Sequence, residues 1–168
     1  MDSTAADFDA YVRARTPALL RSAYLLTGDQ HLAEDLVQDA LIRTHRAWRR
    51  LADSNPDAYT RKVMYHLNIG WWRRGRSAER STEQVPERAE AGRYDVSDNR
   101  LVLRHALNQL PPKRRAVIVL RYFEDLTESA TAEVLGISIG TVKSQTSKAL
   151  VQLRKFAPQL LEVEGMLR

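Results

Sequence analysis

The sequence has 168 residues, a net charge of +5 and no cysteine. This length allows one ordinary domain or two small ones, and leaves little room for a large catalytic barrel. Without cysteine, disulfides, thiol redox chemistry and thiolate zinc sites are excluded. The seven Gly and six Pro are fewer than an average soluble domain contains, which disfavours folds built from strands and turns.

The sequence pattern shows no membrane or export signal. No apolar run approaches the roughly 20 residues that a membrane span needs. Residues 1–10 are acidic and lack the basic start and apolar middle of a signal peptide. We therefore expect a cytoplasmic protein with no membrane partner.

The distribution of charge is more informative than its total, because the basic residues are mostly Arg and a GC-rich genome also favours Arg codons. Residues 59–80 contain six basic residues and one acid, and residues 138–156 contain four basic residues and no acid. Residues 27–42 contain four acids and no Lys or Arg. This pattern predicts two surfaces for nucleic acid and a separate one for a protein partner.

The first half of the chain predicts three helices. Residues 8–27 form the first, in which Pro17 marks a break or a first turn. Asp29 caps a second helix, and turn-forming residues at 52–57 separate it from a third helix at 58–74. The expected apolar face of the second helix consists of Leu32, Leu36, Val37, Ala40, Leu41 and Trp48.

Residues 75–99 have the composition of a linker, since large aliphatic residues are nearly absent there. Helical periodicity resumes at Leu101 and stops at the two prolines 111–112, and further helices are expected at 116–122, 126–135 and 138–156. The prediction is an all-α protein with a first domain at 1–75, a flexible linker at 76–99 and a second domain at 100–168.

Residues 127–156 have the pattern of a helix-turn-helix. Gly136 supplies a left-handed turn, Ile137 fills the elbow and Ser138 caps the following helix. The outer face of that helix is small, polar and basic, as insertion into a major groove requires. It consists of Thr141, Lys143, Ser144, Gln145, Ser147 and Lys148. The alternative is an ordinary amphipathic helix pair with a solvated basic face.

The third helix interleaves aromatic and basic residues. Tyr59, Val63, Leu67 and Gly70 share one side. The other side and the helix end carry Arg61, Lys62, Tyr65, Asn68, Trp72, Arg73 and Arg74. Rings beside Arg residues can hold unstacked bases and bind phosphates. The alternative is that Tyr65 and Trp72 pack on a neighbouring helix.

Two segments together resemble extracytoplasmic-function sigma factors of the sigma-70 family, most closely the sigma-E-like subgroup. Residues 33–40, Trp48 and the basic aromatic helix resemble their region 2. Residues 110–117, 120–122 and 135–144 resemble their region 4. The resemblance covers nearly the whole chain in the right order.

The resemblance implies a transcription initiation factor that directs core RNA polymerase to promoters. Asp35, Gln38, Asp39 and Arg43 would dock on the clamp helices of the largest polymerase subunit. The loop of Asp53, Ser54 and Asn55 would capture a flipped base of the minus-10 element. The third helix would hold the melted strand, and residues 141–148 would read the minus-35 element as duplex. An anti-sigma factor is a further expected partner.

The sequence departs from the family pattern at His66, Ala130 and Gln145, where many relatives carry Asn, Glu and Arg. A conventional helix-turn-helix regulator that acts without polymerase is the main alternative. An enzyme is disfavoured, because the four His residues have no metal-ligand spacing and no Gly-rich phosphate loop is present. We therefore expect no catalytic residues, no metal and no cofactor.

Overall fold

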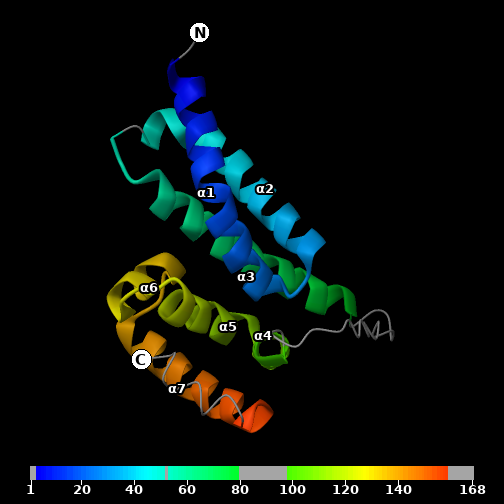
Figure 1. Ribbon diagram of the computed structural model, residues 1–168. Helices are drawn as coiled ribbons and strands as arrows, with labels where there is room; N and C mark the ends of the chain where they lie inside the picture. Colours follow the sequence, from blue (N-terminus) through cyan, green and yellow to red (C-terminus); the bar gives the residue numbers. More distant parts are fainter. Residues whose placement is uncertain (1–2, 52, 80–97, 159–168) are drawn as a thin grey trace.

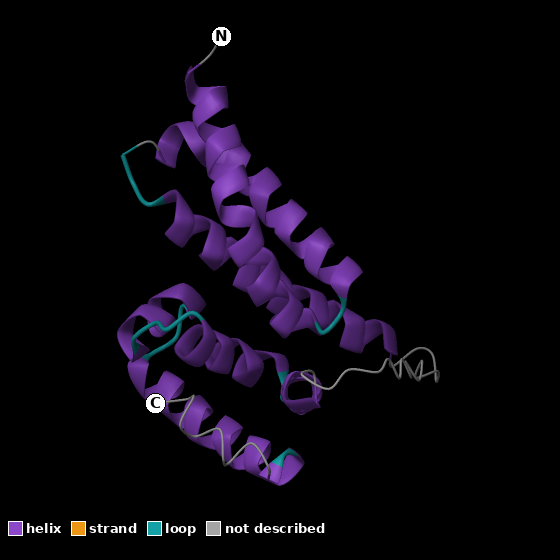
Figure 2. Cartoon of the chain, viewed as in Figure 1, coloured by secondary structure: helices purple, strands orange, loops and turns teal. Residues whose placement is uncertain are grey.

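The computed structural model describes residues 3–51, 53–79 and 98–158, and within these ranges it contains helices and no strand, as Figure 2 shows. The all-α prediction is confirmed. The helices are α1 (Ser3–Thr27), α2 (Gln30–Ala47), η1 (Trp48–Leu51), α3 (Pro56–Glu79), α4 (Asp98–Gln109), α5 (Pro112–Ile118), η2 (Val119–Phe123), α6 (Glu128–Leu135) and α7 (Ile139–Phe156).

The helices form two groups that lie against each other (Figure 1). Helices α1, α2 and α3 pack as a bundle of long helices. Helices α4 to α7 form the second group, in which α5 and α6 both pack on α7. Residues 80–97, which make up most of the predicted linker, lie outside the described residues.

Local signals place the start of α2 correctly, but the prediction for Pro17 is wrong. Asp29 caps α2, its side chain accepting a hydrogen bond from Leu32 N at 3.0 Å. Helix α1 continues through Pro17 to Thr27. Pro17 is exposed, so water can solvate the carbonyl group that the proline leaves without an intrahelical partner.

Two further expectations for the first half need correction. Leu32 is 43% exposed and lies off the buried face of α2, where Leu36, Val37 and Ala40 are buried. Helix α3 begins at Pro56, where the Asn55 side chain accepts a hydrogen bond from Ala58 N, and it continues to Glu79. The helix therefore extends into the segment that composition assigned to the linker.

The helix-turn-helix geometry is confirmed. Thr127 caps α6 and Ser138 caps α7, each side chain accepting a hydrogen bond from a backbone N–H three residues later. Gly136 has φ of +64°, the left-handed conformation that ends α6. Ile137 is half-buried and packs against the hydrophobic core.

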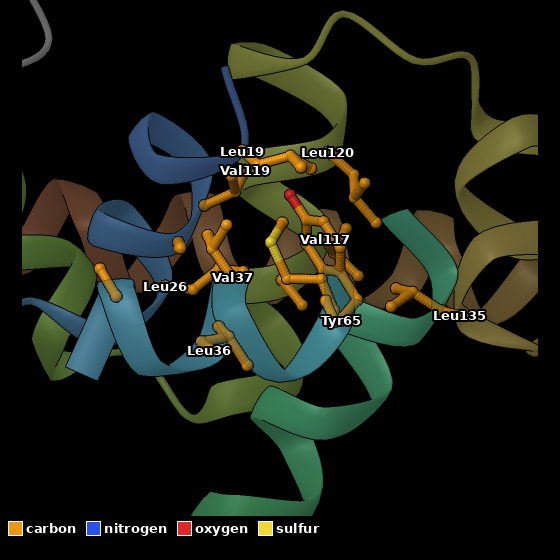
Figure 3. Close-up of a cluster of buried hydrophobic side chains, with 14 of the residues drawn as sticks. Leu19, Leu26, Leu36, Val37, Tyr65, Val117, Val119, Leu120 and Leu135 are labelled. Atoms are coloured by element: carbon orange, nitrogen blue, oxygen red, sulfur yellow. The ribbon is translucent and has the colours of Figure 1, made fainter. Parts of the chain in front are cut away.

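The two groups of helices share one hydrophobic core (Figure 3). The first group contributes Leu19, Leu26, Leu36, Val37 and Tyr65, and the second contributes Val117, Val119, Leu120 and Leu135. A second cluster, which includes Leu107, Ile118 and Leu153, joins α4, α5 and α7. The first and second halves of the chain are therefore packed together rather than merely tethered.

Candidate nucleic-acid and polymerase interfaces

The outer face of α7 is accessible in the structure. Of the six residues predicted to face a duplex, five are exposed, namely Thr141, Lys143, Ser144, Ser147 and Lys148. Buried side chains on the opposite face, including Val142, Ala149 and Leu153, hold the helix on the core. No acidic residue lies between Ser138 and Phe156, so this face is favourable for a polyanion.

Gln145, the sixth member of that face, is half-buried and has a partner on α5. Arg114 donates from Nε to Gln145 Oε1 at 3.1 Å and from one terminal nitrogen to Gln152 Oε1 at 2.6 Å. The guanidinium group thus lies along one edge of α7 and contacts two of its side chains.

The face of α3 predicted to hold a melted strand is largely covered by the second group of helices. Tyr65 and Asn68 are fully buried, and Trp72 is half-buried beneath the Arg115 guanidinium, 5.0 Å from the ring centroid. In this conformation the alternative reading holds for Tyr65, whose ring packs in the shared core (Figure 3). Contact of Tyr65, Asn68 and Trp72 with DNA stays a prediction. In this conformation the second group of helices covers these residues.

A carboxylate from the second group occupies this face. Tyr65 donates its hydroxyl hydrogen to Glu124 Oε2 at 2.6 Å, and Arg61 Nε donates to Glu124 Oε1 at 3.1 Å. Burial raises the pKa of the Tyr65 hydroxyl well above its usual value, and the charge of Glu124 raises it further. Tyr65 therefore stays protonated and bound to Glu124 at neutral pH.

Arg115 and Asn68 are two further polar residues buried between the two groups of helices. Arg115 donates to the carbonyl oxygen of Leu26 on α1 at 2.6 Å and to three carbonyls near the end of α4. Burial lowers its pKa to about 10, so it remains charged at neutral pH. Neither amide atom of Asn68 has a hydrogen-bond partner among the described residues.

The remaining residues predicted for the minus-10 element lie at the surface. The loop residues Asp53, Ser54 and Asn55 are exposed, as are Lys62, Arg73 and Arg74, whereas Arg61 is half-buried. Asn55 also accepts a hydrogen bond at the start of α3, so its carbonyl oxygen has a structural role.

A basic groove of about 490 Å³ lies on α3, on the side that Tyr59, Val63, Leu67 and Gly70 share. Its walls include Tyr59, Val63, Leu67 and Gly70, with cationic groups from Lys62 and Arg74. Arg43 of α2, predicted to contact polymerase, lines it as well. This groove was not predicted from the sequence, although Tyr59, Lys62 and His66 follow one another along one stripe of the helix.

The acidic helix α2 presents Asp35, Gln38, Asp39 and Arg43 to solvent. Beside them an apolar groove of about 720 Å³ runs between α1 and α2. Phe8, Val12 and Leu41 line the groove, and Gln38 lies on its rim. Of the four predicted polymerase contacts, Gln38 thus borders an open hydrophobic surface, and such surfaces are typical of protein interfaces.

The described residues contain no group of three or more His, Asp or Glu residues that could hold a metal ion. Within the same ranges, no helix is both long and apolar enough to cross a bilayer.

The sequence matches two family models in the order expected from its motifs. The model for Sigma-70 region 2 matches residues 11–78, and that for Sigma-70, region 4 matches residues 100–153. The RNA polymerase sigma-E factor of Streptomyces avermitilis is 43% identical over 150 residues, which are 89% of this chain and 84% of that protein.

The chain belongs to the extracytoplasmic-function sigma factors of the sigma-70 family. The ECF RNA polymerase sigma factor SigE of Mycolicibacterium smegmatis is 31% identical over 156 residues, covering 89% of this chain and 61% of that protein. Among solved structures, the sigma factor RpoE of Bartonella quintana, in complex with the anti-sigma factor NepR, superposes with a TM-score of 0.69. It is 29% identical, and the match covers 90% of this chain and 97% of that one.

The family assigns α1 to α3 to region 2 and α4 to α7 to region 4. This sigma factor therefore acts in transcription initiation by RNA polymerase. Glu124 belongs to region 4, so its bonds with Tyr65 and Arg61 join the two regions.

Proposed function

We propose that this sigma factor docks on core RNA polymerase through α2, reads the minus-35 element as duplex through α7 and holds the melted minus-10 strand on α3. The exposed, acid-free face of α7 in a capped helix-turn-helix carries the proposal. A helix that is buried on one side and polar and basic on the other can enter the major groove. The division predicted from the sequence, with region 2 at 1–75, a linker at 76–99 and region 4 at 100–168, belongs to this proposal, except that α3 continues to Glu79 and α4 begins at Asp98.

The melted strand needs a surface that replaces lost base stacking and binds phosphates. The groove beside Tyr59, Lys62 and Arg74 offers a ring and cations, and it is open in this conformation. The predicted loop at 53–55 leads into the same helix, where it would receive a flipped base. Strand binding therefore begins at this groove and the loop.

Contacts from Tyr65, Asn68 and Trp72 require region 4 to move away from α3. In this conformation, the Glu124 carboxylate binds Tyr65 and Arg61, where a DNA phosphate would bind once region 4 has moved. The buried amide of Asn68, which has no hydrogen-bond partner among the described residues, destabilises this conformation. Polymerase binds the two regions at different points, and the free energy of this binding favours their separation. The free sigma factor consequently binds promoter DNA weakly.

On α2, the exposed acids and the neighbouring apolar groove suit an amphipathic partner with basic flanks, as clamp helices would provide. The similarity to RpoE, solved with the anti-sigma factor NepR, supports an anti-sigma factor as a second partner. The protein acts in the cytoplasm, where polymerase and promoters are found. RNA synthesis itself is the chemistry of the polymerase.

Coelution with core RNA polymerase, followed by run-off transcription on a genomic fragment library, tests the proposal. We expect a stable complex and discrete start sites that share two upstream elements. Asp39→Arg reverses the charge at an exposed position of α2 and should abolish coelution. The matched change Glu133→Arg, at an exposed position of α6, should leave coelution intact. A chain that ignores polymerase but shifts duplex DNA alone would identify a conventional regulator instead.

A further inference from the structure

One side chain on the α7 face is held by a residue outside the helix. Arg114, on α5, bonds to Gln145 and Gln152, which are seven residues apart on one stripe of α7. Lys148 lies between them on the same stripe and is exposed. Arg114 therefore lies along the edge of the surface that we assign to the minus-35 element.

The chemistry of arginine determines how the Gln145 amide is turned. A guanidinium group has donors only, so the atom of Gln145 that faces Arg114 must be the carbonyl oxygen Oε1. The second bond, to Gln152 Oε1, holds the planar group from its other end. The NH₂ group of the Gln145 amide is then free to donate a hydrogen bond to a base.

We infer that Arg114 is a positioning residue that makes Gln145 a hydrogen-bond donor to the minus-35 duplex. Glutamine recognises adenine by using both ends of its amide, accepting from N6 and donating to N7. Arg114 takes one of the two lone pairs of Oε1 and holds this oxygen toward α5, which disfavours that pair of contacts. The donating end instead suits the acceptors of guanine, N7 and O6, or of thymine, O4. The inference rests on the proposed role of α7.

Holoenzyme reconstituted with the full-length chain and a promoter library randomised over the minus-35 element provides the test. Gln145→Ala identifies the base position that depends on this side chain. At that position Arg114→Ala releases the amide, and we expect the use of adenine relative to guanine to rise at least about fivefold. Gln152→Leu, which removes one anchor of Arg114, shifts the preference in the same direction by a smaller factor.

Lys113→Ala is the matched control, because it removes one positive charge from the neighbouring exposed residue of α5. It lowers transcription from all promoters alike and leaves base preference unchanged. If Arg114→Ala also lowers transcription from all promoters alike and leaves base preference unchanged, the inference is overturned, because Arg114 would then contribute only charge. If Gln145→Ala alters no position, both the inference and the reading of the minus-35 element by Gln145 fail. A position-specific effect of Gln145→Ala with a uniform effect of Arg114→Ala refutes the positioning role alone.

Discussion

The Glu124 carboxylate joins the two regions, and Glu124→Gln should weaken that connection. Glutamine keeps the shape and can still accept a hydrogen bond from Tyr65. However, it removes the ion pair with Arg61 and turns an N–H group toward that cation, which donates to Glu124 at 3.1 Å. The side chains of Arg61 and Glu124 are 19% and 15% exposed, so solvent screens the pair only in part.

The size of the effect follows from the strength of such bonds. A hydrogen bond to a charged group contributes about 1.5–3 kcal/mol net. Loss of that amount shifts the equilibrium between closed and separated regions by about 10- to 150-fold. The change acts on the contact between regions and leaves the helices of each region intact, because Glu124 lies in the short segment after η2.

Energy transfer between dyes on the two regions measures the separation. The chain has no cysteine, so Ala14→Cys on α1 and Val151→Cys on α7, both exposed, create a unique labelling pair. In a urea titration, Glu124→Gln should lose transfer at a lower midpoint than the parent chain. Glu133→Gln removes the same charge from an exposed position on α6 and should match the parent. Coinciding midpoints for all three proteins would refute the role of Glu124.

Three further predictions concern the turn, the recognition helix and the buried tyrosine. Gly136→Ala should lower the free energy of unfolding by about 1–2 kcal/mol in urea melts, because alanine is strained at a φ of +64°. No steric term adds to this loss, since nothing lies within 4 Å of the added Cβ. A larger loss would indicate a steric clash instead. Lys148→Ala should reduce use of upstream duplex elements and lower the salt slope of promoter binding by about one, while coelution with polymerase is unchanged. Equal loss of both activities would contradict the assignment of α7. The raised pKa of Tyr65 means that its stabilising contribution is complete below about pH 10, the usual tyrosine value, and is lost as the pH rises through its higher folded-state pKa. Energy transfer in the labelled chain should therefore weaken with alkali, and Tyr65→Phe should remove this component; an identical profile for both proteins would exclude Tyr65 as its source.

Features that depend on neighbouring residues were predictable from the sequence. Caps at Asp29 and Ser138 and the left-handed Gly136 each act within about three residues, so composition and spacing reveal them. The exposed face of α7 follows from its helical period, since the apolar side must be buried. Pro17 is an exception, because a long helix with an exposed proline tolerates the lost bond.

The faces of α3 could not be read in the same way. Both sides mix rings, cations and small residues, so the helical period alone does not say which side is buried. Tyr65 is buried because Val117 and Leu120 pack around the same core, more than 50 residues further along the chain. The groove beside Tyr59 and Lys62 lies open on the other side of the helix.

By itself the sequence determined the helical class, the order of the two regions and the polar face of the helix-turn-helix, because these depend on local periodicity, capping and motif order. Tertiary structure alone decided that region 4 covers α3 and that Glu124 bonds Tyr65 across 59 residues of chain. It also decided that Arg114 of α5 donates a hydrogen bond to Gln145 of α7. These contacts join residues distant in sequence, and their geometry exists only once two apolar surfaces have packed together.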